Sequence, residues 1–169
     1  PEEYQPTGSY NFSIGDDILQ LDMENVSIIG NTANIGAGLG ALSGIINGNR
    51  LFIVENVGPY GSAISLGEPL GLVIDDISIS ITNSTIANNN AGFSTGGIYC
   101  FRASLNLTNS IVFNNNKMGV TLSEMNAEPT ITYSNIYGNA TDVTSGYYLI
   151  ENVITNKIIT HSRNERGVN

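Results

Sequence analysis

Apolar and polar residues alternate with a period of two in several short segments of this chain. The clearest are residues 79–82 (ISIT) and 105–108 (LNLT), whose apolar positions hold isoleucine or leucine. A period of two places successive side chains on opposite faces of a β-strand, and β-branched residues favour strands. No segment sustains the three- and four-residue spacing of an amphipathic helix. The pattern therefore predicts an all-β protein built from short strands.

The strands belong to a unit that recurs along the chain: an apolar strand, a polar corner centred on Asn, a second short strand, then Asn or Gly. ISITNSTIANNN from Ile79 aligns with LNLTNSIVFNNN from Leu105, and the two copies lie 26 residues apart. Looser copies are MENVSIIGNTA from Met23, VENV from Val54, ITYSNIYGN from Ile131 and IENV from Ile150. In this alignment Val54 is equivalent to Met23 and to Ile81. Successive copies start roughly every 25 residues.

Short strands at this interval suit a solenoid in which each strand pairs with its equivalent one turn away. A β-sandwich would instead show hairpin turns about every 8 to 12 residues and no self-alignment. We therefore predict a parallel β-helix of about five coils over residues 21–160. Residues 1–20, in which Tyr10, Phe12 and Ile14 alternate as in a strand, are predicted to form an N-terminal strand or cap, and residues 161–169 a polar tail.

Asparagine at the corners has a physical reason. Its backbone tolerates the left-handed conformation that a sharp corner needs, and its amide can bond to the backbone or to the next Asn in a stack. We interpret runs such as Asn114, Asn115 and Asn116 as structural ladders. The alternative interpretation is a polar surface that binds a ligand.

Three segments resemble a known family. GGIYC from Gly96, SLNLTNSIVFNNN from Ser104 and ITYSNIYGN from Ile131 are similar, in this order, to strands of the right-handed β-helix repeat proteins that bacteria and archaea export to their surfaces. The resemblance covers about residues 77–140 well and residues 21–76 more loosely. It implies a right-handed helix and an extracellular, elongated module that is commonly one section of a larger chain.

A related likeness is to the passengers of polymorphic autotransporters, whose hallmarks are GGAI-like and FxxN motifs. GSAI from Gly61, GGIY from Gly96 and FNNN from Phe113 approach those motifs. They are not iterated many times here, and no autotransporter barrel is present. The likeness therefore bears on fold and export, and not on activity.

Composition limits the partners. The chain has 169 residues and a formal net charge of -9, from six Lys and Arg against fifteen Asp and Glu. This acidic balance argues against nucleic acid and anionic membranes, both of which require clustered positive charge. The apolar runs are far shorter than the ~20 residues of a membrane-spanning helix. Because the chain starts at Pro1 and not at Met, we expect a mature or excised segment.

Many parallel β-helices cleave polysaccharides, which makes carboxylate pairs candidates for catalysis. Asp75 and Asp76 are the best pair, because they precede the strand at Ile77 and resemble the paired Asp of polygalacturonase-like hydrolases. The GHG and RIK-like motifs of those enzymes are missing, however. Adjacent residues on a strand also point to opposite faces. We expect a solvated corner here, with a hydrolase or lyase as the alternative.

The glycine-rich strand carries the candidate ligand-binding residues. Ile98 and Cys100 alternate with Tyr99 and Phe101, so the first pair is predicted to face the core and the second pair the outside. Exposed aromatic rings can stack on sugar rings or pack against a neighbouring domain. Arg102 lies beside them and could contact a sugar acid. Cys100 is interpreted as a buried structural thiol.

No cofactor is predicted, although calcium is a candidate where Asp and Asn converge. Asp16, Asp17 and Asp22 are the candidates for such a metal site, and no EF-hand or RTX pattern accompanies them.

The leading hypothesis is a non-catalytic structural or adhesive module that is secreted or displayed at the cell surface. Its expected partners are glycans, other surface proteins or, by end-to-end contact, copies of itself. A polysaccharide-degrading enzyme is the first alternative, and a self-assembling extracellular filament subunit is the second.

Overall fold

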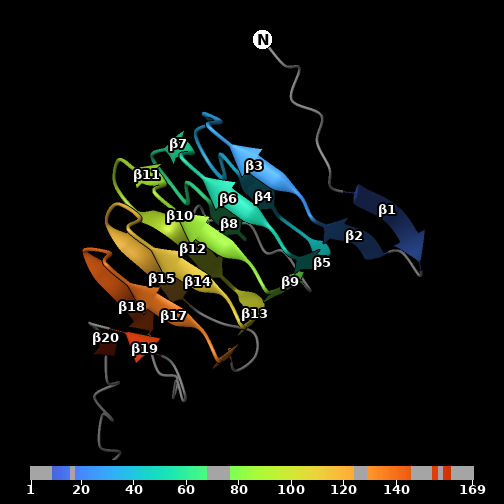
Figure 1. The fold of residues 1–169 in the computed structure, drawn as a ribbon. Coiled ribbons are helices and arrows are strands. Elements are labelled where there is room, and N and C mark those ends of the chain that lie inside the picture. Colours follow the sequence, from blue (N-terminus) through green and yellow to red (C-terminus); the bar gives the residue numbers. More distant parts are fainter. Residues whose placement is uncertain are drawn as a thin grey trace, which may run out of the picture.

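The computed structural model describes residues 9–15, 18–67, 77–123, 129–145, 154–155 and 158–160. In these residues every regular element is a β-strand, and no helix is present, so the all-β prediction is confirmed. Most strands belong to three six-stranded sheets, and successive turns of the chain lie side by side in each (Figure 1).

The first sheet contains β1 (Ser9–Gly15), β2 (Ile18–Glu24), β5 (Gly44–Asn49), β9 (Ile77–Thr82), β13 (Ala103–Thr108) and β16 (Thr130–Thr132). The second contains β3 (Ser27–Ile29), β6 (Phe52–Val54), β10 (Thr85–Ala87), β14 (Ile111–Phe113), β17 (Asn135–Tyr137) and β19 (Ile154–Thr155). The third contains β4 (Leu39–Ala41), β8 (Ile64–Leu66), β12 (Thr95–Phe101), β15 (Met118–Ser123), β18 (Thr141–Ser145) and β20 (Ile158–Thr160). β7 (Val57–Gly58) and β11 (Asn90–Ala91) form a separate pair.

The chain passes through the first, second and third sheets in turn and then returns to the first. We call each such passage a coil. All pairings between named strands are parallel except that of β1 with β2, which is antiparallel. The arrangement is compatible with a β-helix, because equivalent strands of successive coils are direct neighbours.

The register tests the repeat that the sequence indicates. Ile81 pairs with Leu107, and Leu107 with Ile131, as the alignment predicts. The assignment of Val54 is wrong, because Val54 pairs with Ile29 and Ala87 in the second sheet. The position equivalent to Ile81 in that coil is Gly48. The error has a physical cause, because an Asn follows a short apolar strand at two different corners of each coil. The sequence ENV occurs at one corner at residues 24–26 and at the other at residues 55–57.

Every second residue of a strand faces inward, and these inward-facing residues form the core. In the second sheet, the middle residues of four successive strands form a fully buried column of Ile53, Ile86, Val112 and Ile136. In the first sheet, β9 alternates between buried and half-buried residues along its length. Burial of these branched side chains between the sheets supplies the hydrophobic stabilisation of the fold.

Among the described residues, the corner between the first and second sheets is a left-handed backbone position in each of five coils. It is occupied by Asn25, Arg50, Asn83, Asn109 and Tyr133, with φ from 49° to 56°. The backbone N–H of each of the first four donates to the carbonyl before the next corner, at 3.0 to 3.1 Å. Asparagine suits this conformation, whereas arginine and tyrosine do not favour it.

Candidate functional site

A column of asparagines runs through the stack at the end of the second-sheet strands. Asn56 and Asn89 are fully buried, and Asn115 is nearly so. The Nδ2 of Asn56 donates to Oδ1 of Asn89 at 2.9 Å, and the Nδ2 of Asn89 donates to Oδ1 of Asn115 at 2.8 Å. Asn31 and Asn139 extend this buried asparagine column at its two ends.

The same residues also satisfy buried backbone groups. The backbone N–H of Asn56 donates to Oδ1 of Asn89 at 3.0 Å, and that of Asn89 to Oδ1 of Asn115 at 3.1 Å. Asn114 donates to Asn88 at 2.7 Å, and Asn116 to Asn90 at 2.5 Å, on the exposed side. The interpretation of this asparagine run as a structural ladder is therefore confirmed.

A second buried column consists of serines. It directly follows the corner between the first and second sheets, which we call the first corner. The Oγ of Ser84 accepts a hydrogen bond from the backbone N–H of Leu51 at 2.9 Å. In the same way, the Oγ of Ser110 accepts from the backbone N–H of Ser84 at 3.1 Å, and the Oγ of Ser134 accepts from the backbone N–H of Ser110 at 3.2 Å. The sequence analysis missed this column, although NS at 83–84 and 109–110 and SN at 134–135 mark the region.

The outward face of the first sheet carries a set of polar side chains that we call the first-sheet polar strip. It consists of Gln20, Asp22, Glu24, Asn47, Asn49, Ser80 and Thr82. Residues two apart on a strand share a face, so each of β2, β5 and β9 contributes alternate positions. A hollow of about 210 Å³ opens on the strip, and Ser80 and Thr82 of β9 are part of its lining.

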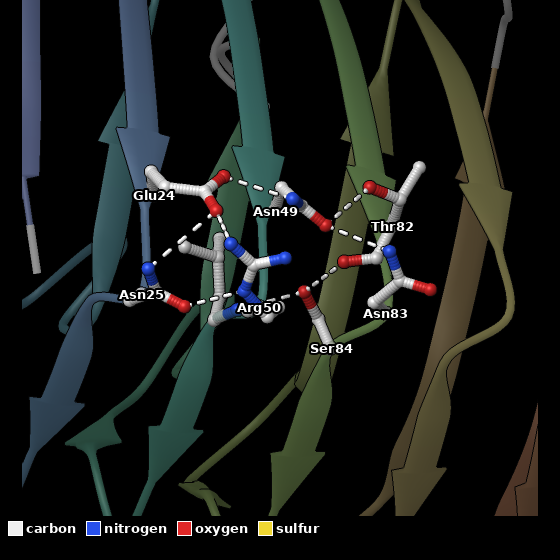
Figure 2. Close-up of polar contacts among 8 residues, drawn as sticks. Glu24, Asn25, Asn49, Arg50, Thr82, Asn83 and Ser84 are labelled. Carbon is white, nitrogen blue, oxygen red and sulfur yellow. Dashed lines mark hydrogen bonds and ion pairs between the residues drawn. The ribbon is translucent and has the colours of Figure 1, made fainter.

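Hydrogen bonds between coils fix the side chains of the strip (Figure 2). The Nδ2 of Asn49 donates to Oε2 of Glu24 at 2.8 Å, and Thr82 Oγ1 donates to Oδ1 of Asn49 at 3.1 Å. Arg50 forms an ion pair with Glu24 and donates from Nε to Asn25. Three coils are thereby linked across the corner.

The neighbours of Asp22 favour the ionised form of its carboxyl group. The Nδ2 of Asn47 donates to Oδ1 of Asp22 at 2.7 Å, and Nε2 of Gln20 donates to both carboxylate oxygens. These bonds, with that from Asn47 the larger, lower the pKa of the Asp22 carboxyl below its ordinary value of 3.8. Hydrogen bonds that favour the charged form act in this direction. The strip can therefore present carboxylate, amide and hydroxyl groups to a polar ligand at neutral pH.

The candidate residues of the glycine-rich strand lie on β12 and directly after it. Tyr99 and Phe101 are half-buried and alternate with Ile98 and Cys100, which are fully buried. Arg102 has a φ of 50°, and its guanidinium carbon lies 5.2 Å from the centroid of the Phe101 ring. The structure thus brings Phe101 and Arg102 together in a cation–π contact. Tyr99 and Phe101 belong to the third sheet and Arg102 directly follows it, so none of the three lines the first-sheet polar strip.

Cys100 is a free, buried thiol, as its alternation with Tyr99 indicates. Burial raises the pKa of this thiol well above its ordinary value. A neutral thiol that solvent does not reach is unreactive, which agrees with a structural role.

The remaining candidates divide in two. Asp22 lies in the first-sheet polar strip, whereas Asp16, Asp17, Asp75 and Asp76 lie outside the described residues. Over the part of the chain that the structure describes, no three His, Cys, Asp or Glu side chains are grouped so as to hold a metal ion. The sequence analysis missed Glu24, Asn47 and Asn49, because their proximity depends on the register between coils.

Among the described residues, no helix is long and apolar enough to cross a membrane. Comparison with protein-family models, with curated proteins and with solved structures finds no match for this chain.

Proposed function

We propose that this chain is a right-handed parallel β-helix module of a secreted or cell-surface protein, with a structural or adhesive role. The observation that carries the proposal is the buried asparagine column, which joins successive coils through side-chain and backbone hydrogen bonds. Satisfied buried polar networks rigidify a structure. A rigid stack that displays its outward side chains at a fixed repeat suits a scaffold or an adhesive surface.

The outward face supports the adhesive form of the proposal. The first-sheet polar strip holds its carboxylate, amide and hydroxyl groups in place before any ligand arrives. Preorganised groups lose little entropy on binding. Glycans and other surface proteins are the partners that we infer, and the net charge of -9 disfavours polyanions among them.

The test separates adhesion from catalysis. The purified chain is passed over immobilised polysaccharides, and the same polysaccharides are assayed for new reducing ends and for unsaturated products. An adhesive module is retained without cleavage. Cleavage of any polysaccharide would overturn the proposal in favour of the hydrolase or lyase, and Asp75→Ala and Asp76→Ala would then locate the activity.

The cellular location is tested on intact producing cells. An antibody raised against the chain is used to follow its removal by a protease that cannot enter the cells. Loss of the signal is expected for a surface module, and the medium should contain the chain if it is secreted. Protection from the protease, with no chain in the medium, contradicts the proposal.

A second candidate is the self-assembling extracellular filament subunit, and the first coil favours it. β3 and β4 are edge strands that pair on one side only among the described residues. A hollow of about 260 Å³ at this end is lined by the apolar side chains of Leu19, Leu21, Leu39, Leu42, Ile45 and Ile46. Leu19 and Leu42 are 44% and 52% exposed. Unpaired edges beside open apolar surface are sites for pairing with another chain.

A further inference from the structure

The corner occupied by β7 and β11, at one side of the stack in Figure 1, carries two columns of side chains. Val57 pairs with Thr32 in the preceding coil and with Asn90 in the following one. Tyr60 pairs with Ile35, and the Tyr60 and Phe93 ring centroids are 6.2 Å apart. The first column consists of Thr32, Val57 and Asn90. The second consists of Ile35, Tyr60 and Phe93, and we call it the aromatic column.

The aromatic column is exposed to solvent. Phe93 is 79% exposed, Tyr60 43% and Ile35 39%. Phe113 and Tyr137, by contrast, stack at 5.5 Å on the second sheet and are half-buried. Contiguous exposed apolar side chains rimmed by polar groups mark interaction sites.

A hollow of about 530 Å³ lies at this corner, and Tyr60 and Phe93 directly follow its lining residues Pro59 and Gly92 in the chain. Its walls include Thr32, Asn34, Val57, Pro59, Asn90 and Gly92, none of which is charged. The close approach of the preceding coil requires glycine at position 58, since a Cβ there would lie 2.4 Å from the carbonyl oxygen of Ala33. A hollow of this volume, lined by small and apolar residues with a few polar groups, has the composition of a small-molecule site.

The polar groups of the hollow have hydrogen-bonding capacity to spare. Thr32 and Asn34 are exposed, and their side chains take part in none of the hydrogen bonds between described residues. The Oδ1 of Asn90 accepts from Nδ2 of Asn116 at 2.5 Å, which leaves the Asn90 amide nitrogen to donate. A hydroxyl and two amide groups therefore line one uncharged hollow, and two exposed rings lie next to that lining in the sequence.

We propose that this hollow binds one or two rings of an uncharged saccharide. A sugar ring presents a face of C–H groups, which packs on Tyr60 or Phe93, and a rim of hydroxyls, which both donate and accept as the amides of Asn34 and Asn90 do. An acidic sugar finds no cation in the lining and meets the repulsion of a chain with net charge -9. The inference rests on the adhesive function proposed above, and it names the ligand class and the surface.

The experiment titrates the full chain with cellohexaose, maltohexaose and mannohexaose, and with hexagalacturonate as the acidic probe, by calorimetry and by amide NMR. We expect at least one uncharged probe to bind and to shift the amides of residues 32–35, 57, 58, 60 and 90–93. Loss of a ring contact in Phe93→Ala should weaken that binding by roughly threefold to tenfold. Asn34→Ala should weaken it by a similar factor.

The matched control is Tyr133→Asn, which removes a ring that is equally exposed, at 78%, but lies at the first corner. Its affinity should equal that of the wild type, and the melting temperature of Phe93→Ala should be unchanged.

Four outcomes would overturn the inference: no uncharged probe binds, hexagalacturonate binds in preference, Phe93→Ala binds as tightly as the wild type, or Tyr133→Asn weakens binding as much as Phe93→Ala. Phe93-dependent attachment to cells stripped of glycans would assign the hollow to a protein partner instead. None of these results touches the proposed module, which fails only by cleaving polysaccharide or by lying inside the cell.

Discussion

Asn89 lies in the middle of the buried asparagine column and is fully buried. Its Nδ2 donates to Oδ1 of Asn115 and to the carbonyl oxygens of Ile53 and Ala87, while its Oδ1 accepts two bonds from Asn56. In Asn89→Ala these buried partners lose their bonds, at about 1–3 kcal/mol for each group left unsatisfied. We expect the free energy of unfolding to fall by about 3 kcal/mol or more, as measured by urea denaturation.

The control for this prediction is Asn106→Ala. Asn106 is exposed on β13 and accepts one hydrogen bond, from Thr108, so its removal should change stability by less than about 0.5 kcal/mol. Equal losses in the two variants would contradict the view that burial makes the column important.

Tyr133 occupies a corner that favours asparagine. Its φ is 51° and its side chain is 78% exposed, so it bears the left-handed strain without gaining burial. The corner below it holds Asn109, which donates from Nδ2 to Oδ1 of Asn83 at 2.6 Å. Tyr133→Asn relieves the strain and lengthens this exposed ladder, and we expect a gain of about 0.5–1 kcal/mol.

Thermal unfolding of Tyr133→Asn beside Tyr137→Asn distinguishes strain relief from a general benefit of asparagine. Tyr137 is not at a left-handed position and stacks on Phe113, so its replacement should lower the melting temperature. A lower melting temperature for Tyr133→Asn would contradict the view that Tyr133 strains the backbone at this corner.

The first sheet as an element is expected to respond to pH through Asp22. The folded pKa of its carboxyl is lowered, chiefly by Asn47 and then by Gln20. A lowered pKa means that the carboxylate stabilises the fold fully above its unfolded pKa, near 3.8. That contribution is lost as the pH falls through the lower, folded pKa.

The measurement is the melting temperature of the wild type and of Asp22→Asn between about pH 6 and pH 2.5. We expect the wild type to lose more stability than the variant over the acid end of this range. Parallel curves for the two proteins would rule out a contribution from Asp22.

At the scale of elements, local alternation was enough to predict strands such as β9 and β13 and their mutual register. It failed at Val54, because two corners of one coil share a short apolar strand followed by Asn. The neighbours in the first-sheet polar strip could not be found from the sequence, since Asp22 meets Asn47 only through the pairing of β2 with β5. Tyr60 and Phe93 were also missed, because they lie in connections of unequal length that the sequence repeat does not align.

At the scale of the whole molecule, the described stack has an incomplete layer at the first coil. β1 covers the edge of the first sheet through its antiparallel pairing with β2, but no described strand covers β3 or β4. Within the stack, each coil buries the inward side chains of the one before it. The inward-facing Leu39 of the first coil is only half-buried, whereas Ile64, its equivalent in the next coil, is fully buried.

A second copy stacked on this end would complete the layer and bury Leu42 with the half-buried residues around it. Such a contact joins one end of a copy to the other end of the next, so it does not close and gives linear particles. For this second candidate function, the mass from light scattering is expected to rise with protein concentration, and electron microscopy is expected to show particles longer than one chain. Leu42→Glu places an unpaired charge in the contact and should return the protein to the monomer mass.

Ile111→Glu is the matched control, because Ile111 is 40% exposed on the side of the stack, on β14. It should leave the association unchanged, since an end-to-end contact does not include the second sheet's outward face. A mass that stays monomeric at every concentration excludes the filament and leaves the isolated module with its outward surfaces as the functional ones. Dissociation by both variants would place the contact along the side of the stack, where the edge strands have no part in it.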